Sequence, residues 1–206
     1  MNVKPILFLL FSIITLLSSC KPTVQHLPYL GSNKIVDGEE VRHQIRSFNY
    51  IDQDSLAFNA DVLNGNIYLA DFFFTSCPSI CPRVMKNMLR VQEKYKDILN
   101  FKLVSFSLDP KRDTPARMKK YAENIGADLS MWHFVHGPKD SIMAIANEDY
   151  YVPAFEDPDA PGGFDHSGKL LLIDGNGHLR GFAEGTEDED VTEFFNTIDA
   201  LLAQSK

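Results

Sequence analysis

The stretch "NIYLADFFFTSCPSICPRVMKNM", residues 66–88, decides the fold. Its first part, Asn66–Phe74, is apolar almost throughout and rich in aromatic and branched residues, which is typical of a strand buried on both faces. Apolar residues then recur at helical spacing over Pro82–Ile98, and proline suits the first turn of a helix. Cys77 and Cys81 are therefore predicted to lie at the junction between a buried strand and a helix.

The remaining chain continues this alternation of strands and helices. Thr114 is suited to cap a helix and Gly126 to end it, and the turn "DGNG" predicts a hairpin near the C-terminus. The other predicted elements are strands at 101–109, 132–136, 169–174 and 178–183, and helices at 114–126, 140–147 and 186–202, the last of them opened by Thr186. We predict an α/β protein with a mixed central sheet flanked by helices, a C-terminal β-hairpin and a final helix, similar to the thioredoxin fold.

The N-terminus has the features of an export signal. Lys4 precedes the apolar run Ile6–Leu17, which is too short to cross a bilayer comfortably as a permanent helix. The following "LSSC" resembles a bacterial lipobox, so we predict a lipoprotein signal peptide at 1–19, cleaved before Cys20, which then carries the lipid. An ordinary cleaved signal followed by a coincidental cysteine is the alternative.

The segment after the predicted cleavage site is polar, contains prolines and glycines, and shows no sustained periodicity. Residues 20–40 are therefore interpreted as a flexible tether, and 41–206 as one thioredoxin-like domain. Lipidation would hold this domain on the extracytoplasmic, periplasmic side of a membrane. Acidic residues exceed basic ones, 28 against 20, with a dense cluster at 184–193, which argues against nucleic-acid binding.

Cys77 and Cys81 admit several chemistries. They are four residues apart, so a disulfide between them closes almost no loop and would stabilise the fold little. A helix N-terminus lowers thiol pKa values, which suits disulfide exchange or metal binding. The spacing is one residue wider than that of thioredoxin-like reductases, and Thr75 is one position away from the threonine of a peroxiredoxin site. Among metals, Cu(I) needs only two or three soft ligands, so copper is favoured.

A third ligand is sought among the histidines. His133 and His136 belong to one predicted strand and point to opposite faces, so at most one of them could reach the thiols. His166 lies in a glycine-rich loop just before a strand, and in a thioredoxin-like sheet this loop lies beside the cysteine end of the first strand. His166 is therefore the candidate third ligand. Its neighbour Asp165 could orient the ring, although a solvated loop carboxylate is the commoner role.

Three motifs follow one another along the predicted domain: "TSCPSICP" at 75–82, "SLDPKRDTP" at 107–115 and "DHSGKLLLIDGNG" at 165–177. Together they resemble the Sco/SenC family of copper proteins, which are required to assemble cytochrome c oxidase. The resemblance extends from about residue 48 to residue 202. It implies that Cys77 and Cys81 supply copper thiolates, that His166 is the third ligand, and that Asp109 of the "DP" motif lies near the site.

By its resemblance, the chain is expected to be a membrane-tethered copper metallochaperone that delivers copper to the dinuclear copper centre of a cytochrome c oxidase subunit. Cu(I) would be held by the two thiolates alone or with imidazole, and Cu(II) would need His166 as well. A redox-active disulfide between Cys77 and Cys81 would abolish binding, because only thiolates are ligands. The sequence indicates neither the copper donor nor a thiol reductant.

A rival function from another class is an enzyme, a thiol-disulfide reductase that keeps the copper-ligating cysteines of a partner reduced. A third alternative is a thiol or copper sensor that acts through partner binding alone. The first two functions can coexist in one protein. We expect the chain to act as a metallochaperone rather than as an enzyme.

Overall fold

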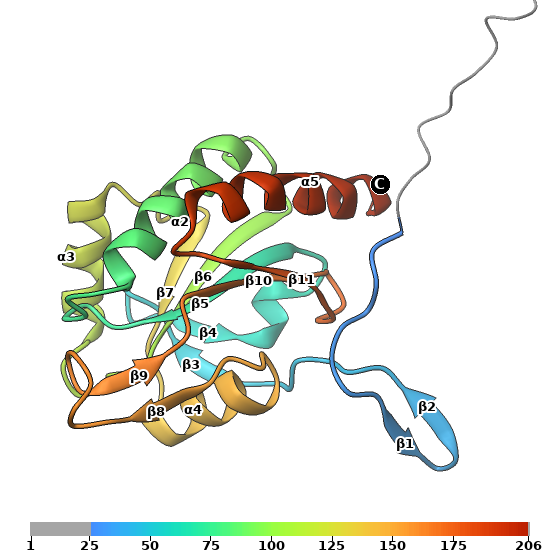
Figure 1. Ribbon diagram of the computed structural model, residues 1–206, viewed down its shortest axis with the longest axis horizontal. Coiled ribbons are helices and arrows are strands. Elements are labelled where there is room, and N and C mark those ends of the chain that lie inside the picture. Colours follow the sequence, from blue (N-terminus) through green and yellow to red (C-terminus); the bar gives the residue numbers. More distant parts are fainter. Residues whose placement is uncertain (1–25, 206) are drawn as a thin grey trace, which may run out of the picture.

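The computed structural model describes residues 26–205, which contain one five-stranded mixed sheet (Figure 1). Its strands are β5 Ile67–Phe73, β6 Phe101–Ser107, β7 Trp132–Val135, β10 Lys169–Ile173 and β11 Leu179–Glu184. They lie in the order β11-β10-β5-β6-β7. β5, β6 and β7 run parallel, whereas β10 is antiparallel to both of its neighbours. The expected α/β architecture with a mixed sheet and a C-terminal hairpin is confirmed.

Helices cover both faces of this sheet. They are α2 Cys81–Tyr95, α3 Pro115–Ile125, α4 Lys139–Glu148 and α5 Asp188–Gln204. α2 and α5 pack side by side on one face, where Lys94 pairs with Asp199 at 2.8 Å, and α4 lies on the opposite face (Figure 1). In residues 26–205, no helix has both the length and the apolar character needed to cross a membrane.

β5 is the central strand, and every one of its residues is buried. On one face, the ring of Phe72 lies 5.3 Å from the ring of Phe106 and 5.3 Å from that of Tyr150. On the other face, Phe73 contacts the ring of Tyr121 in α3. Because neither face of the strand reaches water, its sequence is apolar almost throughout. The carboxyl end of β5 leads directly into the loop that carries the two cysteines.

Three two-stranded ribbons and a short helix are not predicted from the sequence. They are β1 Lys34–Val36 with β2 Glu39–Val41, β3 Asn49–Ile51 with β4 Ala57–Asn59, β8 Ala154–Glu156 with β9 Phe164–His166, and the 3-10 helix η2 Ala60–Leu63. Each of these strands is too short to show a repeating pattern of burial. The last helix also differs from the prediction: it begins at Asp188 after Glu187, so Thr186 does not open it. Acidic residues in its first turn, rather than a hydroxyl cap, face the positive end of the helix dipole.

The segment before β1 differs from the flexible tether that the sequence predicts. Residues 27–31 lie against the body, where the backbone N–H of Leu30 donates to the carbonyl oxygen of Leu179 at 2.9 Å. The side chains of Leu27 and Leu30 pack against the core, which the polar average of the segment conceals. β1 and β2 then form an exposed hairpin. The predicted signal peptide and the predicted lipidation site Cys20 lie outside the described residues.

The core contains an ionisable side chain with an incomplete set of hydrogen bonds, Asp71 of β5. Trp132 Nε1 donates to Ser105 Oγ at 2.9 Å, and Ser105 Oγ donates to Asp71 Oδ1 at 2.5 Å. The other carboxyl oxygen, Oδ2, is buried and has no hydrogen-bond partner among the described residues. Burial disfavours the charged form and raises the pKa of Asp71 to about 7, although the hydrogen bond from Ser105 opposes this shift.

This carboxyl predicts a specific dependence of stability on pH. Between about pH 4 and about pH 7 the unfolded carboxyl is ionised while the native one keeps its proton, so the free energy of unfolding falls as the pH rises. The Asp71 contribution is roughly 1.4 kcal/mol per pH unit, and it levels off once both states are ionised. Urea unfolding at several pH values measures it. The substitution Asp71→Asn removes this component, so parallel pH curves for the two proteins would contradict the burial argument.

Candidate metal centre

Cys77, Cys81 and His166 meet at the carboxyl end of β5. Cys77 lies in the loop after the strand, Cys81 is the first residue of α2, and His166 is the last residue of β9. One donor atom from each side chain, two sulfurs and a ring nitrogen, lie within 4.8 Å of one another. Cys81 Sγ and His166 Nε2 are 3.8 Å apart, and both thiols are free. The fold thus brings together the three side chains that the sequence singles out.

The cysteine loop is fixed at both ends. The backbone N–H of Cys77 donates to the carbonyl oxygen of Phe74 at 3.1 Å, which closes a tight turn directly after β5. α2 then begins at Cys81 with Pro82 in its first turn. Proline loses no helix hydrogen bond there, because the first N–H groups of a helix have no partner within it. The positive end of the helix dipole favours negative charge, so this position favours thiolates.

The ring of Phe74 holds the imidazole of His166. The two ring centroids lie 5.4 Å apart in an edge-on arrangement, and Phe164 packs on the same phenylalanine at 5.2 Å. Nδ1 of His166 lies 3.3 Å from the carbonyl oxygen of Ser167. A proton on Nδ1 would therefore point at this oxygen and leave the lone pair of Nε2 free for a ligand. Since Ala154 also pairs with His166 in the β8–β9 ribbon, the imidazole is held by backbone and ring contacts together.

Asp165 and Asp109 are the two acidic residues expected near the site. Among residues 26–205, neither of them forms a hydrogen bond with the three donor side chains. Asp165 is exposed, because neighbouring residues in a strand point to opposite faces. The ring of His166 lies beside a backbone carbonyl and not beside the Asp165 carboxylate. Asp109 is buried just after β6, where its carboxylate accepts from the backbone and side chain of Arg112. Arg112 in turn donates to the carbonyl oxygen of Gly162 at 2.6 Å. Asp109 thus supports a loop around the site, and neither acid orients His166.

Asp113 holds the cysteine loop, although the sequence does not single it out. Its fully buried carboxylate accepts from the backbone N–H of Thr75 at 3.0 Å, from the Thr75 hydroxyl at 2.5 Å and from the Ser107 hydroxyl at 2.7 Å. Thr75 stands just before Cys77, so this network sets the position at which the loop leaves β5. In the sequence, Asp113 stands shortly after a predicted strand, inside "SLDPKRDTP". An ordinary turn aspartate would occupy the same kind of position.

Two histidines of the Trp132–His136 segment have structural roles. Nδ1 of His136 lies 3.0 Å from the carbonyl oxygen of Asp113. The ring of His133 packs on Phe58 at 4.9 Å, and burial lowers its pKa. Within the part of the chain that the structure describes, neither histidine belongs to the group of three donors. The expectation that at most one of them could reach the thiols is consistent with these contacts.

The two thiols share a proton. A hydrogen bond from the Cys81 thiol lowers the pKa of Cys77 to about 3, with help from His166, while burial opposes this shift. The same hydrogen bond, together with burial, raises the pKa of Cys81 well above the usual thiol range. The pair titrates as a unit. The pair therefore favours the thiolate at Cys77 and the protonated thiol at Cys81.

Two sulfurs and one imidazole form a soft ligand set. This set suits Cu(I), and the imidazole extends it to Cu(II). Structural zinc sites have four protein ligands, whereas this group has three donors within residues 26–205. The thiols of Cys77 and Cys81 are buried, but Pro78 and Ser79 between them are exposed, so a partner can approach the loop. The site can therefore bind a soft metal ion at low coordination number or exchange disulfides.

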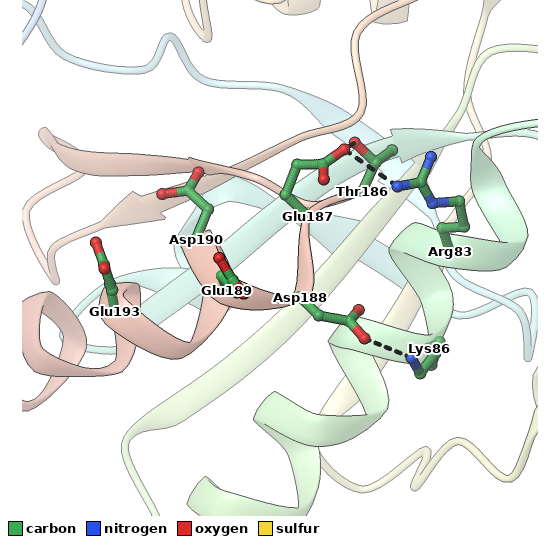
Figure 2. A pocket seen from close by; sticks show the side chains of 8 residues that line it. All are labelled: Arg83, Lys86, Thr186, Glu187, Asp188, Glu189, Asp190 and Glu193. Carbon is green, nitrogen blue, oxygen red and sulfur yellow. Dashed lines mark hydrogen bonds and ion pairs between the residues drawn. The ribbon is translucent and has the colours of Figure 1, made fainter.

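A charged hollow lies beside α2 and the start of α5 (Figure 2). Arg83 pairs with Glu187 at 3.1 Å and Lys86 with Asp188 at 2.6 Å, as the dashed lines in Figure 2 show. Exposed ion pairs of this kind contribute at most about 1 kcal/mol. The acidic residues also face the positive end of the α5 dipole. We therefore assign this cluster to the solvation and stabilisation of the helix start.

Fold and site together define a class of protein: a thioredoxin-like domain in which two thiols and an imidazole meet at the carboxyl end of the central strand. A family model described as SCO1/SenC matches residues 36–202. The chain belongs to the SCO1/SenC family, as the resemblance of its motifs predicts.

Three similar proteins illustrate the relationship. The SCO2-like protein of Rickettsia felis is 32% identical over 193 residues, which cover 90% of this chain and 87% of the relative. The solved structure of BsSco, described as a Sco-family cytochrome c oxidase assembly protein with a disulfide switch, has a TM-score of 0.68 at 25% identity and covers 77% of this chain and 93% of that chain. Bradyrhizobium japonicum ScoI with copper bound has a TM-score of 0.58 at 26% identity, with 74% of this chain and 98% of that chain covered.

The thiol pair predicts unequal reactivity of the two cysteines. We expect iodoacetamide to modify Cys77 at a nearly constant rate from about pH 5 to about pH 9, because a thiol with a pKa of about 3 is fully ionised throughout this range. In Cys81→Ala the hydrogen-bond donor is missing, so the rate at Cys77 should rise with pH. Peptide mapping by mass spectrometry measures the rate of modification at Cys77 in the parent protein and in the variant. A rate in the parent protein that grows about tenfold per pH unit would contradict the shared proton.

A second prediction concerns Asp113. In Asp113→Asn an amide nitrogen replaces one acceptor oxygen, so a buried donor of Thr75 or Ser107 loses its partner. We expect the free energy of unfolding to fall by about 1–3 kcal/mol, and the amide of Cys77 to exchange its hydrogen faster. Asp159→Asn, at an exposed aspartate, is the matched control. Equal stability of the two variants would show that the carboxylate does not hold the loop.

Proposed function

We propose that this chain is a copper metallochaperone that delivers copper to a cytochrome c oxidase subunit with a dinuclear copper centre. The observation that carries the proposal is the meeting of Cys77, Cys81 and His166 within 4.8 Å at one end of the sheet. Membership of a family with a copper-bound representative supports copper as the cargo. The description of BsSco as an oxidase assembly protein supports the oxidase as the partner.

The donors of this chain would hold copper in two ways. Cu(I) is bound by the sulfurs of Cys77 and Cys81, alone or with imidazole, and Cu(II) by both sulfurs and Nε2 of His166. Only thiolates are ligands, so binding removes the proton that the pair shares at neutral pH. Transfer proceeds by stepwise exchange of these ligands for those of the partner. Oxidation of the pair to a disulfide removes both thiolates and turns binding off.

A thiol-disulfide reductase is the second candidate function, because a thiolate at Cys77 beside a thiol at Cys81 is the arrangement that exchange requires. The Cys77 sulfur attacks a partner disulfide, forms a mixed disulfide and releases one partner thiolate. The Cys81 sulfur then loses its proton to solvent, attacks the Cys77 sulfur and releases the second partner thiolate. The partner gains two electrons and the chain ends as a disulfide, which a thiol reductant must reduce again.

The proposed function includes a location. A lipid on Cys20 would hold the domain on the extracytoplasmic, periplasmic side of a membrane. The support is the lipobox-like "LSSC" that follows the apolar run Ile6–Leu17. Several acyl chains together hold a protein firmly on a membrane, because each buried methylene contributes about 0.8 kcal/mol.

Copper titration under reducing conditions tests the proposal. We expect one equivalent of Cu(I) to bind, and Cys77→Ser or Cys81→Ser to abolish binding, because a single thiolate leaves too few soft donors. His166→Ala should keep Cu(I) but lose Cu(II) affinity by at least about 100-fold, since the loss even of a group behind a ligand costs 10- to 100-fold. Absorption of the thiolate–copper charge-transfer band follows the Cu(II) form.

The exposed His26 supplies the matched control, and His26→Ala should bind both ions like the parent protein. If the parent protein does not bind one equivalent of Cu(I), the copper proposal is wrong. Oxidase assembly in cells separates the two candidate functions. Assembly that survives His166→Ala but not either cysteine substitution would favour the reductase.

A further inference from the structure

Residues 27–31, the strap, contact a buried arginine of the body. Arg180 in β11 pairs with Asp174 at 2.9 Å, and both side chains are buried. Its Nη2 donates to the carbonyl oxygen of Leu27 at 2.8 Å, and its Nε donates to that of Pro28 at 3.1 Å. A buried guanidinium needs acceptors for its N–H groups. The strap supplies two of these acceptors, so it completes the hydrogen bonding of the body.

Side-chain contacts hold the same segment. The ring of Tyr29 lies between the guanidinium groups of Arg42 and Arg180, which are 4.0 and 4.2 Å from its centroid. Cations over an aromatic face are attracted by the ring quadrupole. Leu30 packs its side chain against the core and donates its backbone N–H to the carbonyl oxygen of Leu179. Ring, apolar and backbone contacts therefore fix one short piece of chain in one place.

Gly31 ends the strap with a turn. Its φ of +100° lies in the left-handed region that favours glycine. A Cβ at this position would also lie 2.7 Å from the ring of His43, so the backbone approaches the body too closely for a side chain. The chain then continues into the exposed β1–β2 hairpin.

The strap lies at the end of the sheet opposite the thiols. Ile173 at the end of β10 pairs with Tyr68 near the start of β5, and the N–H of Gly65 donates to the carbonyl oxygen of Gly175 at 2.8 Å. The β10–β11 turn, and the strap beside it, therefore meet the amino end of β5. The cysteine loop follows the carboxyl end, about 20 Å away at about 3.3 Å per residue. Figure 1 shows the blue N-terminal segment and β9 on opposite sides of the molecule.

We propose that the strap makes the anchoring chain leave the domain at the end opposite the thiols, so that the three donor side chains face away from the membrane. This inference rests on the proposed anchoring at Cys20. About seven residues then join Cys20 to Leu27, a span of at most about 25 Å when fully extended. A free tether reaching Val41 would span about 75 Å by the same measure. The strap thus keeps the domain closer to the membrane than a free tether would and places the anchored end away from the thiols.

This orientation selects the kind of partner that can receive the metal. In this orientation the thiol end lies up to about 20 Å farther from the membrane than the strap does. The donors then do not face an acceptor site at the level of the lipid headgroups. The matching partner is a membrane protein whose metal-accepting ligands stand in a domain that projects from the same side of the membrane.

Amide hydrogen exchange tests the docking of the strap without a membrane. The amide of Leu30 should be protected, because it donates to Leu179, and Tyr29→Ala should accelerate its exchange at least tenfold. Ile35→Ala, at an exposed position in β1, is the matched control and should leave the exchange unchanged. An unprotected Leu30 amide in the parent protein would overturn the proposal.

Energy transfer on phospholipid vesicles tests the orientation of the full lipidated chain. A donor fluorophore is placed through a non-natural amino acid either at Phe155, in β8 beside the site, or at Asn176, in the turn beside the strap; both positions are exposed. Acceptor-labelled lipids are present in the vesicle. We expect transfer at Asn176 to be at least twofold more efficient than at Phe155, and Tyr29→Ala to reduce this difference.

The outcomes separate the inference from the function on which it rests. Equal transfer from both labels in a vesicle-bound parent protein overturns the orientation and leaves the anchoring intact. A chain that does not associate with vesicles, although its Leu30 amide is protected, overturns the proposed anchoring and the membrane orientation together. Copper binding by Cys77, Cys81 and His166 is measured separately and is decided by neither result.

Discussion

The antiparallel ladder between β10 and β5 determines which side chains can meet at the thiols. It sets Leu171 opposite Ala70, so the chain that enters β10 passes beside the carboxyl end of β5. His166 lies shortly before β10 in the chain, and Cys77 lies in the loop that follows β5. A slip of one residue would turn every side chain of β10 to the other face of the sheet. The burial of β10 against the core therefore also fixes the position of the third donor, although His166 itself pairs with no residue of β5.

Buried contacts that are not ligands hold the donors in place. The carboxylate of Asp113 binds the start of the cysteine loop through Thr75, and the ring of Phe74 holds the imidazole of His166. Donors that are already positioned lose little conformational freedom on binding, which favours affinity. The thiols remain free to share a proton or to oxidise, and three donors leave room for the ligand of a partner. Both properties suit the proposed transfer of copper to a partner.

The parts of the structure that could be predicted have strong local patterns. β5 and α2 show apolar residues at the period of a buried strand and of a helix, and these patterns place Cys77 and Cys81. The position of His166 followed from the order of strands in a thioredoxin-like sheet and from the family resemblance. The roles of Asp71 and Asp113 could not be predicted, because a carboxylate has the same local signature whether its partners are water molecules or buried donors from other strands. The docking of the strap has no local signature for a related reason: its partner Arg180 lies about 150 residues away along the chain.

β5 also separates the two ends of the domain that have different tasks. The strand is buried on both faces and paired along both edges, so one end cannot shift without the other. The strap contacts the start of β11, beside the amino end of β5, whereas the hydrogen bond that lowers the pKa of Cys77 lies beyond the carboxyl end of β5. Short-range contacts at one end therefore do not alter the thiol chemistry at the other, because their direct effect does not extend over about 20 Å of packed strand. A rigid strand does fix the direction of one end relative to the other, so the strap influences where the thiols point. The reactivity of the thiols is determined by Cys81, His166 and the start of α2.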